Sequence, residues 1–364
     1  MSRKLDKSFL IIVLILAFGG FFLFTSASLG LYAREGARFG AVAFNQAFLG
    51  LFLGFIGMYI VSRVDYKFWK RYSFYIFLLS ILVTLLVFIP KFGLSSGGAT
   101  RWLSVGPLSF QPAEFLKLGF VIYFAAWISG VQSKIKQFKF GLLPLIILLV
   151  ITGAILLAQP DTGTFIVIAG TGMLMFFAAG GSWRDVFIAG AIGLVALVVI
   201  GLSKPYVFDR LLTFFDPGRD IQGSSYQINQ SLIAIGSGKV FGRGFGQSVQ
   251  KFDYLPEPIG DSIFAVAAEE WGFIGSVIIL VMFLLFALRG FRISTRAPDI
   301  FGSMLVAGII SLIFIQSIIN IASMLGIFPL TGLPLIFVSH GGTALFFALL
   351  EVGIILSVSR KTTI

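Results

Sequence analysis

The chain lacks cysteine altogether, has a single histidine, His340, and is only 12% charged. Without cysteine it can form neither a disulfide framework nor a thiolate metal site, and one histidine makes a histidine-based metal cluster implausible. Soluble domains carry about 25% charged residues, so the scarcity of charge argues against a soluble protein. The residues that are present are 57% hydrophobic, with a mean hydropathy of +0.99, which indicates an integral membrane protein.

The hydrophobic residues are grouped in long apolar runs. A run of about 18 or more residues can cross the bilayer as a helix, because the hydrocarbon core is about 30 Å thick and a helix rises about 1.5 Å per residue. We therefore predict an all-α polytopic membrane protein. Its ten expected spans are residues 8–28, 44–62, 72–89, 111–131, 141–158, 162–180, 186–203, 263–288, 300–323 and 340–359.

Lysine and arginine are divided unevenly among the segments that connect these spans. Segments on the side of the N-terminus hold 16 of them, whereas the short loops on the other side hold four, Arg34, Arg38, Lys91 and Arg101. Positive residues collect on the cytoplasmic side of membrane proteins, so both termini are predicted to be cytoplasmic. The formal charge of +11 then reflects this asymmetry and does not point to a nucleic-acid partner.

One outward segment, residues 203–262, is much longer than the other loops and is rich in Gly, Ser and Gln. Five apolar positions within it predict a short amphipathic helix that lies against the bundle: Tyr226, Ile228, Leu232, Ile233 and Ile235. Before the last span, "GIFPLTGLPLIFVSHGGT" mixes Pro and Gly with apolar residues, which predicts a broken or re-entrant element. We treat residues 1–364 as one transmembrane domain that carries this extracytoplasmic loop.

Charged residues inside the spans are informative because each costs about 2.5 to 3.5 kcal/mol on insertion scales. Glu114 and Lys117 lie three residues apart on one helix face, where they can pair. The pair either fixes helix packing or lines a polar cavity that holds a substrate. Glu269, Glu270 and Glu351 are also within spans, and one of the first two is expected to cap a polar network inside the bundle.

Asp261 stands at the start of the eighth span, after the helix-hostile "PEPIG". It either caps that helix or stays ionised at the outer membrane surface and acts as a general base. Glu257, just before it, fits a loop or substrate contact better than a second catalyst. The outward basic residues are either solvated loop residues or a binding site for phosphate or pyrophosphate, and they are Arg101, Arg210, Arg219, Lys239 and Arg243.

The location of these residues restricts the chemistry. Cytoplasmic nucleotide-activated donors do not reach an outward loop, so a group transfer there needs a substrate activated by attachment to a membrane lipid. A lipid pyrophosphate fits both the basic residues and the bilayer. The glycine-rich "GSGKVFGRGFG" would let backbone approach such a ligand, although its order of Gly and Lys does not match a nucleotide-binding loop.

Five stretches of the sequence, taken in order, resemble one known family. They are "TSAS", "GGATRWLSVGPLSFQPAEFLK", "QPDTGT", "RLLTFFDPGRDIQGSSYQINQSLIAIGSGKVFGRGFGQSVQKFDYLPEPIGDSIFAVAAEEWGFIG" and "NIASMLGIFPLTGLPLIFVSHGGT". They are similar to the SEDS family (shape, elongation, division and sporulation proteins), which includes RodA, FtsW and SpoVE, and the resemblance covers nearly the whole chain. "GQSVQK" before "YLPE" is more similar to the division type, FtsW, than to the elongation type, RodA.

The resemblance implies a peptidoglycan glycosyltransferase of the bacterial cytoplasmic membrane, which polymerises lipid II into glycan strands for septal or elongation wall synthesis. It implies a class B penicillin-binding protein transpeptidase and other division or elongation proteins as partners. The family's essential aspartate falls on Asp261, here the expected general base of an inverting transfer. The family's usual His-Thr before it is Ile259-Gly260, the Phe after it is Ser262, and a Tyr common in the closing motif is His340.

The expected substrate-binding residues are Arg101, Glu114, Lys117, Arg210, Lys239, Arg243 and Glu257. A divalent cation, Mg²⁺ or Mn²⁺, is a possible cofactor that would assist the leaving pyrophosphate. Two other functions stay open. The charges inside the spans would also suit a lipid II flippase, and a non-catalytic scaffold for division enzymes would use them for packing alone.

Overall fold

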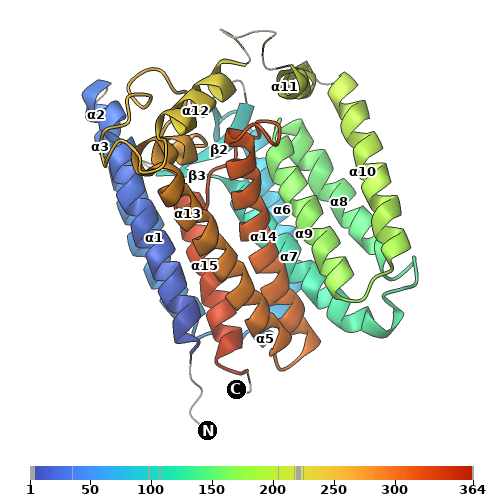
Figure 1. Cartoon of the computed structure of the whole chain (residues 1–364). Helices are drawn as coiled ribbons and strands as arrows, with labels where there is room; N and C mark the ends of the chain where they lie inside the picture. Colours follow the sequence, from blue (N-terminus) through green and yellow to red (C-terminus); the bar gives the residue numbers. More distant parts are fainter. Residues whose placement is uncertain are drawn as a thin grey trace.

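The structure is a computed structural model that describes residues 5–34, 36–96, 99–105, 108–203, 205–216, 218, 223 and 225–362. It is a bundle of long helices in which α1 begins and α15 ends at the same end (Figure 1). The segment between α10 and α13, which carries α11 and α12, lies at the opposite end, called here the loop end.

Each predicted apolar run is helical over most of its length. The corresponding elements are α1 (Lys7–Ala27), η1 (Asn45–Leu53) with α4 (Gly54–Val61), α6 (Ser73–Leu85) with η2 (Leu86–Phe88), α7 (Pro112–Val131), α8 (Leu142–Ala158), α9 (Thr162–Ala178), α10 (Trp183–Ser203), α13 (Ile263–Thr295), α14 (Ile300–Met324) and α15 (Gly342–Ser359). Among the described residues, six helices are long and apolar enough to cross a membrane, and three further apolar helices are shorter. The mostly helical membrane fold is confirmed, and the count of ten spans stays a prediction.

The remaining elements are short. They are α2 (Leu29–Arg34), α3 (Gly36–Phe44), α5 (Lys67–Arg71), η3 (Gln132–Lys134), α11 (Pro205–Phe215) and α12 (Tyr226–Ser237), together with strands β1 (Gly93–Ser96), β2 (Ala99–Val105) and β3 (Leu108–Phe110). The three strands form an antiparallel sheet in the order β1-β2-β3. The all-α prediction missed this sheet, because it lies in a loop where short alternation of residues is outweighed by the long apolar runs on either side.

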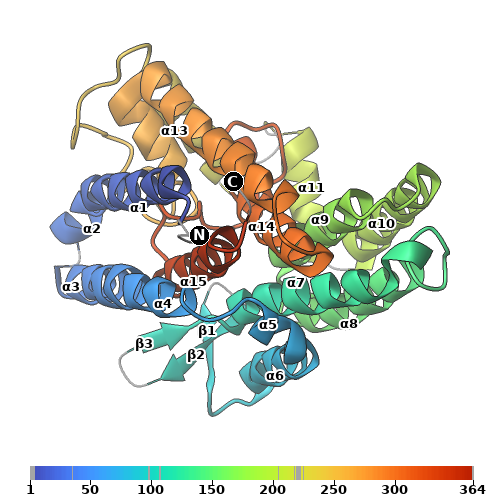
Figure 2. The same cartoon turned by 90° about the horizontal axis from the view of Figure 1, so that it is seen from below.

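The centre of the bundle is made by helices that are apolar on all sides. Seen from below, α15 lies near the middle, with α1, α4, α7, α13 and α14 around it (Figure 2). In α15, 89% of the residues in its apolar 18-residue stretch are buried. In the peripheral helical segment Phe39–Val61 the corresponding share is 17%. A helix that is hydrophobic all round belongs either in a protein core or in contact with lipid, and packing decides between the two.

The predicted amphipathic helix of the long loop is α12, which packs on α13. Its buried face consists of Ile228, Ser231 and Ala234. Leu232 and Ile233, two of the apolar residues that suggested the helix, are instead exposed. The helix itself is therefore confirmed, while the face that it turns to the bundle differs from the one expected.

The predicted broken element between α14 and α15 is also confirmed. Residues 325–341 are non-helical, and most of the segment from Leu333 to Ser339 is buried. Side chains of α14 satisfy its carbonyl groups: Asn320 Nδ2 donates to Leu333 O at 2.8 Å, and Gln316 Nε2 donates to Pro334 O at 3.1 Å. Non-helical backbone is tolerated at membrane depth only with such internal partners.

Candidate active site

Asp261 lies immediately before α13 at the loop end and is held by two amide side chains from different helices. Gln227 of α12 donates from Nε2 to Asp261 Oδ1 at 3.1 Å, and Asn320 of α14 donates from Nδ2 to the backbone oxygen of Asp261 at 2.7 Å. The N-cap residue of α13 is Ser262. The alternative in which Asp261 caps this helix is therefore wrong, because its carboxylate is bonded to α12 instead.

Burial raises the pKa of the Asp261 carboxyl from 3.8 to about 6. The hydrogen bond from Gln227 acts against this increase, the nearby Glu257 carboxylate adds to it, and the Arg210 guanidinium lowers the pKa again. A carboxylate with a pKa near 6 is still mostly ionised at neutral pH. It is also a better proton acceptor than an ordinary aspartate, because a general base works best when its pKa is near the working pH.

The Arg210 side chain of α11 also lies close to Asp261, near Gly332. Its Nη1 donates to Thr331 O at 3.2 Å, in the broken element. A Cβ built on Gly332 would lie 3.7 Å from Arg210 Nη2 and 3.9 Å from Asp261 Oδ2. Gly332 has a φ of 69°, in the left-handed region that favours glycine. This glycine therefore leaves space between the guanidinium and the carboxylate.

Two cavities open beside this group. One of about 280 Å³ is lined by residues that include Tyr226, Lys251, Glu257, Ile259 and His340. A smaller one of about 120 Å³ is lined by Arg210 and mainly apolar residues of α11, α12 and the broken element. Asp261 itself lines neither cavity, but its charged neighbours do, Glu257 the first and Arg210 the second. A polar ligand with an apolar tail could enter such space.

Arg101 has its partners elsewhere, and the structure gives the other predicted basic residues that it describes no contact with Asp261. Arg101 on β2 donates to the backbone oxygens of Gln159 and Pro160, which ties the small sheet to the turn between α8 and α9. Lys239 is exposed, and its carbonyl accepts from the Phe273 amide at 2.9 Å. Arg219 lies outside the described residues. Among the predicted substrate-binding residues at the loop end, Arg210 and Glu257 act on the pKa of Asp261. The substrate roles of all these residues stay predictions.

Glu114 and Lys117 form the predicted pair deep in the bundle, with Oε2 and Nζ 2.9 Å apart and both residues buried. Lys117 Nζ also donates to Gln316 Oε1 at 2.5 Å. Gln316 and Asn320 are one turn apart on α14, so this helix connects the buried pair with the backbone of Asp261. Glu351 of α15 is buried close enough to interact with both charges. Whether the pair serves a substrate cavity stays a prediction.

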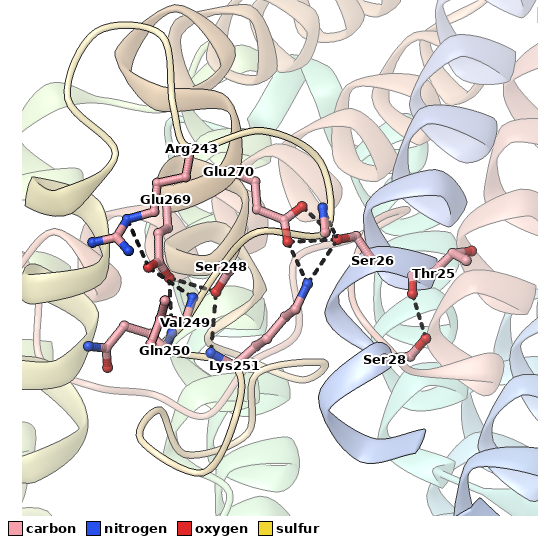
Figure 3. A network of polar contacts seen from close by, with 11 residues as sticks. Thr25, Ser26, Ser28, Arg243, Ser248, Val249, Gln250, Lys251, Glu269 and Glu270 are labelled. Carbon is pink, nitrogen blue, oxygen red and sulfur yellow. Dashed lines mark hydrogen bonds and ion pairs between the residues drawn. The ribbon is translucent and has the colours of Figure 1, made fainter. Parts of the chain in front are cut away.

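Glu269 and Glu270 both lie in one polar network, which confirms and extends the expectation for a single one of them (Figure 3). The Glu269 carboxylate accepts from Ser248 Oγ at 2.6 Å and from the amides of Val249 and Gln250, and it pairs with Arg243 at 3.4 Å. These contacts fasten the loop that follows α12 to α13. Arg243 therefore has a structural partner, and its substrate contact stays a prediction.

Glu270 forms a fully buried ion pair with Lys251, whose Nζ is 2.8 Å from Oε1. Ser26 Oγ of α1 donates to the same carboxylate and accepts from Lys251 Nζ at 3.3 Å. Sequence reasoning missed Lys251, because nothing in "SVQKFDY" distinguishes a buried lysine from a solvated one. Gln227, Gln316 and Asn320 were missed for a similar reason, since neutral amides leave no charge signal in an apolar run.

α13 is interrupted at Gly272, where φ is 67° and ψ is −162°. The loop replaces the lost helical bonds: the amides of Arg243 and Gly244 donate to Glu269 O and Glu270 O, while those of Phe273 and Ile274 donate to Lys239 O and Val240 O. A Cβ on Gly238 or Gly242 would collide with carbonyl groups of α13. The glycine-rich loop was expected to let backbone approach a ligand, and in the structure it lets the backbone approach α13.

Comparisons with known proteins agree over the whole chain. Residues 6–364 match the family model of FtsW, RodA and SpoVE, described as "Cell cycle protein". Stage V sporulation protein E of Bacillus subtilis (strain 168) is 42% identical over 308 residues, which cover 85% of this chain and 84% of that protein. A protein named probable peptidoglycan glycosyltransferase FtsW, from Geobacter sp. (strain M18), is 36% identical over 356 residues, or 98% and 97% of the two chains.

Solved structures show the same fold. One match is a chain from a structure of a peptidoglycan synthase complex, described as showing the structural coordination of polymerization and crosslinking. It has a TM-score of 0.80 and 25% identity, over 99% of this chain and 98% of that one. The rod shape determining protein RodA of Thermus thermophilus matches with a TM-score of 0.71 and 25% identity, with the same coverage.

Proposed function

The chain belongs to the FtsW/RodA/SpoVE family of cell cycle proteins, and we propose that it is a peptidoglycan glycosyltransferase that polymerises lipid II into glycan strands. The names of its FtsW relatives support this activity, and the match to a chain of a peptidoglycan synthase complex supports it further. The observation that carries the proposal is the geometry at Asp261, a carboxylate with a raised pKa whose charged neighbours Glu257 and Arg210 each line a cavity.

Asp261 acts as the general base of an inverting transfer. Its carboxylate takes the proton from the C4 hydroxyl of the acceptor's N-acetylglucosamine while that oxygen attacks the anomeric carbon of the donor. The bond from that carbon to the lipid pyrophosphate breaks, and undecaprenyl pyrophosphate leaves with the electron pair. A well-placed base contributes about 10² to 10⁴ in rate. Arg210 stabilises the leaving pyrophosphate, and its nearness to Gly332 and its effect on Asp261 support this role.

The remaining predicted substrate residues act farther from the reacting atoms. Glu257 lines the larger cavity and faces the acceptor sugar. Arg101, Lys239 and Arg243 contact the lipid-linked substrates at the loop end, while Glu114 and Lys117 hold the bundle open beneath the site.

The described residues contain no group of three or more His, Asp or Glu side chains that could hold a metal ion. A Mg²⁺ or Mn²⁺ cofactor would therefore take most of its ligands from pyrophosphate oxygens and water.

The proposed topology is a single domain of ten membrane-spanning helices in the bacterial cytoplasmic membrane, with both termini in the cytoplasm and residues 203–262 outside. The uneven distribution of Lys and Arg supports it, as does the shared end at which α1 begins and α15 ends.

The partner is a class B penicillin-binding protein, within a division or elongation complex. Support comes from the solved complex, which joins polymerization with crosslinking. Relatives named FtsW favour the division role.

The test is synthesis of glycan strands from lipid II by the purified protein in liposomes, with and without a class B penicillin-binding protein. We expect Asp261→Asn to abolish synthesis while the protein remains folded. The matched control is Asp185→Asn, which makes the same change at the opposite end of the bundle and should keep full activity. Full activity of Asp261→Asn would exclude this carboxylate as the base. Movement of lipid II across sealed vesicles without strand synthesis would support a flippase. If the protein neither makes strands nor moves lipid II, even with a partner present, a scaffold role would be supported.

A further inference from the structure

The contacts of Asp261 assign different tasks to its two carboxylate oxygens. Oδ1 accepts from Gln227 Nε2, whereas Oδ2 is the carboxylate oxygen that lies near Gly332, 3.9 Å from where its Cβ would be, with Arg210 Nη2 at 3.7 Å from the same point. We propose that Gln227 is a positioning residue, which holds the Asp261 carboxylate so that Oδ2 faces the substrate and takes the proton. This inference rests on the proposed function and adds a residue to it.

Gln227 is itself held in a fixed orientation. Its single Nε2 donates to Asp261 Oδ1 at 3.1 Å and to Ser262 Oγ at 3.0 Å, so both hydrogens of the amide are used. Ser262 is completely buried, and Ser231 Oγ donates to the backbone oxygen of Gln227 at 2.8 Å. α12 packs on α13 and α14 and buries Ile228, Ser231 and Ala234, so the helix that carries the amide is held by packing as well as by these hydrogen bonds.

The polarity of this contact favours one protonation state. An amide nitrogen can only donate and an ionised carboxylate can only accept, so the hydrogen bond stabilises the charged form, which is the form that can act as a base. The backbone of Asp261 is held independently by Asn320 of α14. Gln227 therefore controls the direction and charge of the side chain, while Asn320 controls the position of the main chain.

Other charged groups act on the same carboxylate and must be considered with Gln227. Glu257, in the same segment, raises the pKa of Asp261, and Arg210 of α11 lowers it. From the broken element, His340 donates its backbone amide to Ile259 O at 2.6 Å and lines the larger cavity. The substitution of Gln227 changes none of these groups chemically, so we attribute a change in the titration of Asp261 to the lost amide.

The experiment is the pH dependence of lipid II polymerisation, measured as kcat/KM for wild type and Gln227→Met. Methionine has a similar length but no donor. Loss of a hydrogen bond to the charged form raises the pKa of Asp261. The acidic limb of the profile of kcat/KM against pH should therefore move to higher pH by about one unit. Well below that limb, activity should be about tenfold lower than wild type, and most of it should return at alkaline pH.

The matched control is Gln230→Met, which is the same substitution three residues along α12 and should leave the limb in place. A loss of Gln227→Met activity by the same factor at every pH, or an unshifted profile, would overturn the inference. If Gln227→Met cannot be purified folded, Gln227→Leu gives the same test, because leucine also lacks the donor and adds no charge. Should the wild type itself make no strands, the proposed function fails first, so the two failures are distinguishable.

Discussion

The buried ion pair between Lys251 and Glu270 offers the sharpest test of how the loop is held on the bundle. Both side chains are 0% exposed, with Nζ and Oε1 2.8 Å apart. We expect Glu270→Gln and Lys251→Met each to destabilise the fold by about 3 to 5 kcal/mol, because each leaves one buried charge without its partner. In either variant, Ser26 Oγ remains as a neutral partner that compensates little of this cost.

The double variant Lys251→Met/Glu270→Gln should cost much less than the sum of the two single changes. It leaves no buried charge, and what remains is the loss of the hydrogen bonds, about 1 to 2 kcal/mol. The coupling free energy between the two positions is then roughly 4 kcal/mol or more, which is large for a contacting pair. This magnitude follows from complete burial, since an exposed pair is screened by water and contributes about 0 to 1 kcal/mol.

The assay is equilibrium unfolding in mixed detergent micelles for the wild type, both single variants and the double variant. The pair between Lys361 and Asp65, which is partly exposed, provides the control. There, Lys361→Met should cost less than about 1 kcal/mol. If the two single effects at Lys251 and Glu270 simply add in the double variant, the charges are not compensating each other, and the reasoning from burial is wrong.

Four further predictions concern α13 and the site. Gly272→Ala should cost more than about 2 kcal/mol in the same unfolding assay, because φ is 67° and the new Cβ would collide with the loop backbone, whereas Gly19→Ala, with open space around it, should be neutral or stabilising. Polymerisation by the wild type should fall about tenfold per pH unit below pH 6, since Asp261 must be ionised to accept a proton and its pKa is about 6; a profile flat down to pH 4 would contradict this. Arg210→Met should move the acidic limb of the pH profile to higher pH, because the Arg210 guanidinium lowers the pKa of Asp261. Asn320→Leu should reduce kcat by about tenfold or more, as it frees the carbonyls of Asp261 and Leu333, and unchanged kinetics would show that this tether is dispensable.

Local features of the chain were predictable from the sequence. The helix ranges follow from apolar runs, because the bilayer imposes a length requirement on each run separately. The pairing of Glu114 with Lys117 also follows, since residues three apart on a helix are neighbours in any fold. The broken element before α15 was recognisable from its own Pro and Gly residues. In each case the physical cause lies within about 20 consecutive residues.

Tertiary structure alone decided which polar groups meet at the site. Gln227 and Asn320 reach Asp261 across 34 and 59 residues, and Ser26 reaches Glu270 across 244. No local pattern encodes such contacts, because hydropathy identifies a segment that enters the membrane but not the neighbours that it finds there. The same limit explains the unexpected partners of Arg101 and Arg243, and the buried Lys251. The family resemblance selected Asp261 as the candidate base. Its raised pKa, its two amide tethers and its nearness to Arg210 depend on how α11, α12 and α14 pack around the start of α13.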